Sequence, residues 1–165
     1  MRYAVLILLP LMALSAAEPE TSLTRQEVSF LKQAMSYNLR EVKAAEMVLE
    51  HALLSDLRAY AQELIREHSA AVEILKKLAE SKQVIVPSKL TDQELKELFL
   101  LFTTPNSGIS EKYLEDRIQS HTHAISRLKD LRDGGTDDDL KAFAVKVLDA
   151  IEKGLVTARR LENQY

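Results

Sequence analysis

Apolar side chains recur along most of the chain at alternating spacings of three and four residues, which is the period of one face of an α-helix. One such seam reads Leu57, Ala61, Leu64, His68, Ala71, Leu75 and Leu78. A later one reads Leu114, Ile118, His121, Ile125 and Leu128, and the last reads Leu140, Ala144, Val147, Ile151, Gly154, Ala158 and Leu161. The pattern predicts main helices over about 24–53, 55–82, 110–132 and 137–163, and a short helix over about 91–103.

These elements predict an all-α protein, a ferritin-like four-helix bundle with a long link that contains the short helix. The link joins the second and third main helices and is long enough to cross the whole bundle, whereas the short break before Ser55 makes a tight antiparallel hairpin. Thr24 and Glu27 have the spacing of a capping box, and the acidic run at 137–139 suits a helix N-terminus. Gly and Pro, four of each, fall mostly between the helices.

The first seventeen residues have the features of a secretory signal peptide. Arg2 is followed by an apolar stretch from Ala4 to Leu14 and by the small residues Ser15 to Ala17. That stretch is too short to cross a bilayer, although an uncleaved anchor is the alternative. We therefore expect export, with residues 18–165 forming a single helical-bundle domain.

Composition excludes several classes of protein. The chain has no Cys, so no disulfide staples it and no thiol can serve as a nucleophile. Its formal net charge is −3 and becomes −4 without Arg2, and no basic cluster stands out, which argues against a nucleic-acid partner. No later apolar segment is long enough for a transmembrane span in the mature chain.

Each seam is interrupted near the middle of its helix. In the first helix Glu41 interrupts the seam of Phe30, Ala34, Tyr37, Ala44 and Val48, and Asn38 interrupts an adjoining seam. In the later helices the interruptions are His68, His121 and Gly154. The midpoints of bundled helices share one level, so we expect Glu41, His68, His121 and Gly154 to converge. Two histidines and a carboxylate could hold one divalent transition metal with open coordination positions. The alternative is a polar layer in which Glu41 hydrogen-bonds the imidazoles and fixes the helix register.

Other chemistry has less support. A carboxylate-bridged di-iron site needs Glu three residues before His on each of two helices and is disfavoured, because those positions hold Val48, Ile65, Ile118 and Ser120. No Gly-rich phosphate loop or Gly-x-Ser-x-Gly elbow occurs, so the sequence leans away from an enzyme. His51 and His123 lie off the seams and read as surface residues.

The short helix is apolar around its whole circumference. Leu98, Phe99 and Phe102 either close one end of the core or form an interaction surface for a protein partner in the cell envelope.

Four segments of the chain resemble the domain of unknown function 4142 family, which consists of exported bacterial ferritin-like proteins often labelled outer-membrane proteins. The resemblance rests on Leu39-Arg40-Glu41-Val42, on Leu57-Arg58-Ala59-Tyr60-Ala61 leading to Glu67-His68, on Tyr113-Leu114 leading to His121, and on Leu140-Lys141-Ala142-Phe143-Ala144. It implies a ferritin-like fold, an envelope location and no established activity. The family pattern includes Glu41, His68 and His121, but it usually has His at Gly154 and commonly Asn at Val72.

Three hypotheses about function follow from the sequence. The leading one is a periplasmic, non-enzymatic interaction or envelope-stress module. The second is a metal-binding or redox protein that uses the layer of Glu41, His68 and His121. The third is a protein that binds a small ligand in the space beside Gly154.

Overall fold

The computed structural model describes residues 21–52, 54–102 and 108–164, and within these ranges every regular element is a helix. The five helices are α1 (Arg25–Leu49), α2 (Ser55–Ser81), α3 (Asp92–Phe102), α4 (Ile109–Gly134) and α5 (Asp138–Glu162). The predicted all-α class is thus confirmed. The predicted signal peptide at 1–17 lies outside the described residues.

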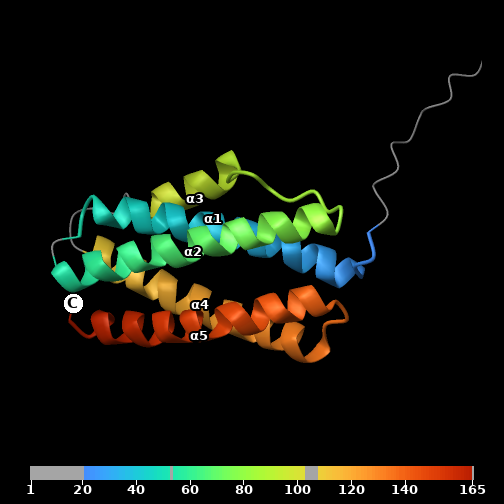
Figure 1. The fold of residues 1–165 in the computed structure, drawn as a ribbon. Helices are drawn as coiled ribbons and strands as arrows, with labels where there is room; N and C mark the ends of the chain where they lie inside the picture. Colours follow the sequence, from blue (N-terminus) through green and yellow to red (C-terminus); the bar gives the residue numbers. More distant parts are fainter. Residues whose placement is uncertain (1–20, 53, 103–107, 165) are drawn as a thin grey trace, which may run out of the picture.

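The four long helices form a bundle of two antiparallel hairpins. α1 packs along α2, and α4 packs along α5; the hairpins then meet through α2 against α5 and α1 against α4 (Figure 1). The link after α2 carries the chain back along the bundle, so that α4 starts at the same end as α2. A bundle with one such long crossover has the ferritin-like connectivity that the sequence predicted.

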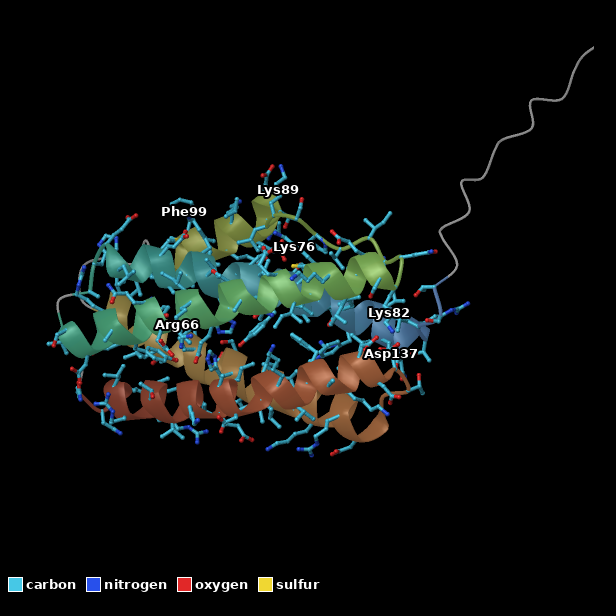
Figure 2. The ribbon with its side chains drawn as sticks, in the orientation of Figure 1. Arg66, Lys76, Lys82, Lys89, Phe99 and Asp137 are labelled. Carbon is cyan, nitrogen blue, oxygen red and sulfur yellow. The ribbon has the colours of Figure 1, made fainter. Side chains whose placement is uncertain are left out.

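α3 lies outside the bundle, against α1 and α4. Leu98 is fully buried and Phe102 is 8% exposed, because both point into the core, whereas Phe99 projects outward and is 56% exposed (Figure 2). The expected interaction surface of Leu98, Phe99 and Phe102 is therefore corrected: two of its three side chains close the core. A helix of eleven residues packed on one side can expose only its other face.

Helix ends agree with the capping signals, with one larger difference. Thr24 and Glu27 form the predicted capping box, and Asp137 caps α5. α1 ends at Leu49 rather than near residue 53, and Arg58 of α2 donates to the carbonyl oxygens of Leu49 at 2.9 Å and of Ala52 at 3.4 Å. These bonds satisfy carbonyl groups that a helix end leaves free.

Two apolar clusters fill the bundle and are separated by a polar layer. The cluster near the start of α1 includes Leu31, Met35, Leu75, Leu140 and Ala144. The cluster at the other end includes Ala44, Ala45, Leu57, Leu64, Leu114 and Ala158. Near one end of the bundle, Lys82 ties the end of α2 to the start of α5 through Asp137 at 2.6 Å and Asp139 at 2.7 Å (Figure 2). No described helix is both long and apolar enough to cross a membrane.

Candidate metal centre

The four residues that interrupt the seams meet at one level of the bundle. Glu41 comes from α1, His68 from α2, His121 from α4 and Gly154 from α5, and all four are buried. The Oε2 atom of Glu41 lies 4.0 Å from His68 Nε2 and 3.9 Å from His121 Nδ1. One ligand atom from each of the three polar residues lies within 4.8 Å of the others. The structure therefore brings together the three candidate ligands that the sequence identified.

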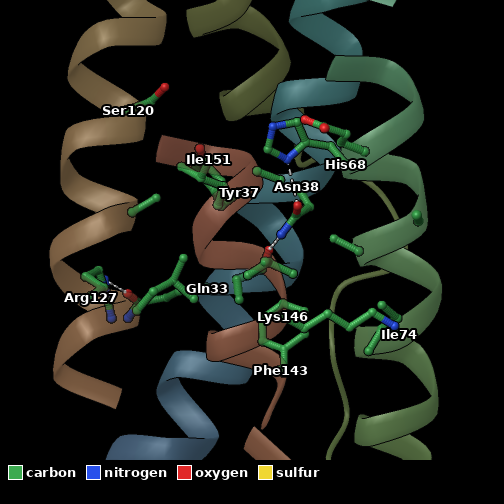
Figure 3. A pocket seen from close by; sticks show the side chains of 18 of the residues that line it. Gln33, Tyr37, Asn38, His68, Ile74, Ser120, Arg127, Phe143, Lys146 and Ile151 are labelled. Carbon is green, nitrogen blue, oxygen red and sulfur yellow. Dashed lines mark hydrogen bonds between the residues drawn. The ribbon is translucent and has the colours of Figure 1, made fainter. Parts of the chain in front are cut away.

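The His68 ring is held in one tautomer by its neighbour Asn38. The Asn38 amide nitrogen donates to the Ala34 carbonyl oxygen at 2.7 Å, so its Oδ1 faces the ring and accepts a hydrogen bond from His68 Nδ1 at 2.8 Å (Figure 3). A proton on Nδ1 leaves the lone pair of Nε2 directed at Glu41. Orientation of a ligating imidazole through its other nitrogen is the usual arrangement around protein-bound metals.

His121 occupies the space that Gly154 leaves open. A β-carbon at position 154 would lie 2.9 Å from His121 Nε2 and 3.1 Å from its Cδ2, which is too close for either atom. The Tyr37 hydroxyl lies 3.4 Å from His121 Nδ1 on the other side of the ring. The space beside Gly154 that the sequence suggested for a small ligand is therefore filled by the imidazole ring.

Sequence analysis missed the fifth member of the layer, Arg117. Its side chain is fully buried and pairs with Glu41 and with Asp116, while Arg40 holds Asp116 through two bonds of 3.0 Å. The guanidinium carbon also lies 5.1 Å from the centre of the Tyr113 ring. Arg117 is four residues before His121, so helical spacing placed it on the seam, but the residue type suggested an exposed side chain.

Burial and the arginine keep both histidines neutral. Burial lowers the pKa of His68 well below its ordinary 6.5, and the neighbouring His121 and Arg117 lower it further. Burial together with Arg117 lowers the pKa of His121 to about 3. Burial also raises the pKa of the Tyr37 phenol, which therefore keeps its proton. Neutral imidazoles carry the lone pairs that a metal ion requires.

The pKa of Glu41 is subject to two opposing influences. Burial raises the pKa of Glu41, and the positive charge of Arg117 acts against that rise. Burial alone would lower the pKa of Arg117, but Glu41, Tyr113 and Asp116 raise it above its ordinary value. Two carboxylates and two guanidinium groups face one another in this network, and the pairing compensates charges that would otherwise be costly to bury.

A protein-family model covers most of the chain. The family model described as "Domain of unknown function (DUF4142)" matches residues 12–161. The chain belongs to this family. No curated protein matches the chain.

Solved structures show where else this fold occurs. A DUF305 fragment from Deinococcus radiodurans superposes with a TM-score of 0.74 at 14% identity, covering 87% of this chain and 99% of that one. CopM in its Cu(I)-bound form gives a TM-score of 0.70 at 17% identity, and in its Cu(II)-bound form 0.72 at 16%, each covering 84% of this chain and 97% of that one. Likeness at these identities shows a shared fold.

The three side chains fit a metal ion after a small contraction. Two ligands at about 2.0–2.1 Å from one ion are at most about 4.2 Å apart. The distances of 4.0 and 3.9 Å from Glu41 Oε2 fall inside that limit, while a 4.8 Å separation has to close by roughly half an ångström. Glu41 Oε1 has no hydrogen-bond partner in the described residues, so the carboxylate has capacity for a ligand beyond Arg117.

Proposed function

We propose that this protein is a non-enzymatic binding protein for a single transition-metal ion, held by Glu41, His68 and His121. The observation that carries the proposal is the fixed tautomer of His68, whose Nε2 lone pair faces the Glu41 carboxylate because Nδ1 bonds to Asn38. A polar layer that only fixed the register of the helices would not require the Nε2 lone pair of His68 to remain available.

Copper is the ion that we propose. Imidazole nitrogen suits copper, zinc, iron and nickel, and among divalent ions copper binds such sites most tightly. Two solved structures of similar fold contain CopM in Cu(I)- and Cu(II)-bound forms, which supports the choice without deciding it. We propose that the ion is bound and carried, with one carboxylate and two imidazoles as its protein ligands.

The same proposal places the protein in the bacterial envelope. The signal-peptide pattern of residues 1–17 supports export to the periplasm, where residues 18–165 would act as one domain. The hypothesis of an interaction or envelope-stress module loses part of its motivation, since Leu98 and Phe102 are buried and only Phe99 of that set is exposed.

Metal binding can be tested with a matched pair of variants on one helix. The full chain, purified without a His tag, is loaded with Cu(II), dialysed and analysed for metal, and its affinity is measured by competition with a chelator. We expect about one ion per chain, a loss of roughly 100-fold or more in affinity for His121→Ala, and no change for His123→Ala, whose ring is exposed two residues away. Asn38→Ala should cost roughly 10- to 100-fold, because it removes the orientation of His68.

Spectroscopy makes the test independent of total metal content. The electron paramagnetic resonance spectrum of the Cu(II) form should show coupling to two imidazole nitrogens, reduced to one in His121→Ala. Circular dichroism checks that each variant is folded. Substoichiometric copper in the wild type, or equal affinities for His121→Ala and His123→Ala, would refute the proposal.

A further inference from the structure

A cavity of about 430 Å³ opens between the two hairpins, next to the polar layer (Figure 3). Side chains from α1, α2, α4 and α5 line it, and most of them are apolar. The main apolar lining residues are Phe30, Ala34, Ile74, Phe143, Val147 and Ile151. Gly154 does not line it, so this cavity is separate from the space that His121 fills.

The size of the cavity points to a small-molecule ligand. Protein interiors leave few voids larger than a water molecule, and sites for small molecules measure about 300–1,000 Å³. An apolar cavity of about 150 Å³ stays dry and takes up benzene, and this one is roughly three times as large. Its apolar walls therefore suit a ligand body larger than one benzene ring, such as an alkyl chain of medium length.

The polar groups at the inner end are already committed. His68 bonds to Asn38, and the Tyr37 hydroxyl faces His121, so this end offers no free charge to an anionic group. The apolar end of a ligand is the part that fits there.

The rim, in contrast, carries positive charge that is not neutralised. Lys146 has no ion-pair partner in the part of the chain that the structure describes, and Arg127 bonds to the neutral amide of Gln33 (Figure 3). Arg66 differs, since Glu63 and Glu67 both pair with it. Two cations without a carboxylate, at the mouth of a cavity in a chain of net charge −3, are complementary to an anionic head group.

We propose that this cavity binds a small amphiphile with one carboxylate group. Its alkyl chain lies among Phe30, Phe143 and Ile151, and its carboxylate lies at the rim, where Arg127 and Lys146 supply positive charge on two sides of the cavity. The site does not depend on the metal centre, and its test uses metal-free protein, so that either proposal can fail alone.

Decanoate is the probe, and isothermal titration calorimetry measures its affinity for the full chain. Val147→Phe fills the cavity and should weaken binding by about tenfold or more, because it removes the space for the alkyl chain. Val145→Phe is the matched control on the same helix: Val145 is 59% exposed and does not line the cavity, so binding should not change.

The charged rim is tested with the double variant Arg127→Gln, Lys146→Gln. It should weaken decanoate binding by roughly tenfold and leave the binding of decanol unchanged, because only the carboxylate interacts with these cations. Equal binding of decanoate and decanol by the wild type would overturn the assignment of the head group.

A second blocking variant guards against a folding defect in Val147→Phe. Ala70 is exposed at the cavity mouth, so Ala70→Phe can obstruct entry without disturbing the core. We expect it to reduce decanoate binding as Val147→Phe does. Absence of decanoate binding by the wild type, or unchanged binding by both blocking variants, would overturn the proposal.

Discussion

Glu27 links the starts of two helices through a single carboxylate. Its oxygens accept hydrogen bonds from the backbone N–H of Thr24 at 2.9 Å, of Thr136 at 2.7 Å and of Asp137 at 2.8 Å, and also from both threonine hydroxyls. The side chain therefore completes the capping box of α1 and fixes the turn before α5. It is only 4% exposed, so water competes little for these donors.

The pKa of Glu27 gives the size of its contribution to stability. Burial alone would raise the pKa, but the backbone donors and the Thr24 hydroxyl lower it from 4.5 to about 2. A difference of about 2.5 units corresponds to roughly 3 kcal/mol in favour of the folded state at pH 7. Because the folded pKa is the lower one, this stabilisation is complete above pH 4.5 and is lost as the pH falls through 2.

Glu27→Gln removes the charge and keeps the shape of the side chain. We expect the free energy of unfolding, measured in urea by circular dichroism, to fall by about 3 kcal/mol at pH 7. The deficit relative to wild type should shrink by more than half by about pH 3, since the wild-type carboxylate is then losing its advantage. A deficit that stays constant between pH 7 and pH 3 would show that the charge contributes nothing.

Glu94→Gln is the matched control for this prediction. Glu94 also forms a capping box, accepting from Thr91 N at 2.7 Å and from Thr91 Oγ1 at 2.7 Å, but it contacts no second helix start. Its replacement should cost only about 1 kcal/mol or less. An equal loss of unfolding free energy in Glu94→Gln and Glu27→Gln would mean that the hydrogen bonds from Glu27 to the turn before α5 add no stability.

Two further predictions concern the polar layer. Arg117→Met should lower the free energy of unfolding by about 3–5 kcal/mol because it leaves the buried Glu41 carboxyl without its partner, and adding Glu41→Leu should recover most of that loss. Urea titration of both variants measures these changes, and no recovery in the double variant would contradict the pairing. Gly154→Ala should destabilise the fold by about 1–3 kcal/mol because the new methyl group would collide with His121. Gly134→Ala should stabilise it by up to about 1 kcal/mol, because Gly134 lies in a helix and has open space beside it. If thermal unfolding ranks the two variants in the opposite order, the predicted collision with His121 is wrong.

The fold was predictable because its determinants are periodic and local. Helical seams and capping residues such as Thr24 and Asp137 located the helices, and the length of the link before α4 gave the crossover. The end of α1 was not predictable in the same way. There the Leu49 carbonyl oxygen accepts a hydrogen bond from Arg58 of the next helix, a contact that the local sequence pattern does not reveal.

The polar layer was predictable in its three candidate ligands and not in its electrostatics. Glu41, His68 and His121 stand out because each interrupts an aliphatic seam. Arg117 also occupies a seam position, but long charged side chains usually carry their charge to solvent, and only the packed structure shows that Glu41 and Asp116 hold this one inside.

The unpartnered atoms of the layer argue against a purely structural role. Among the described residues of the layer, Glu41 Oε1, Arg117 Nε and His121 Nε2 are buried without any hydrogen-bond partner, and each such group costs about 1–3 kcal/mol. The ion pair between Glu41 and Arg117 is already a specific contact that can fix the register of the helices. The two buried histidines are not needed for that purpose, and burying them lowers stability. A metal ion bound to Glu41, to His68 Nε2 and to His121 Nδ1 would give the two imidazoles a role in the layer, and copper titration of the wild type and His121→Ala tests that role directly.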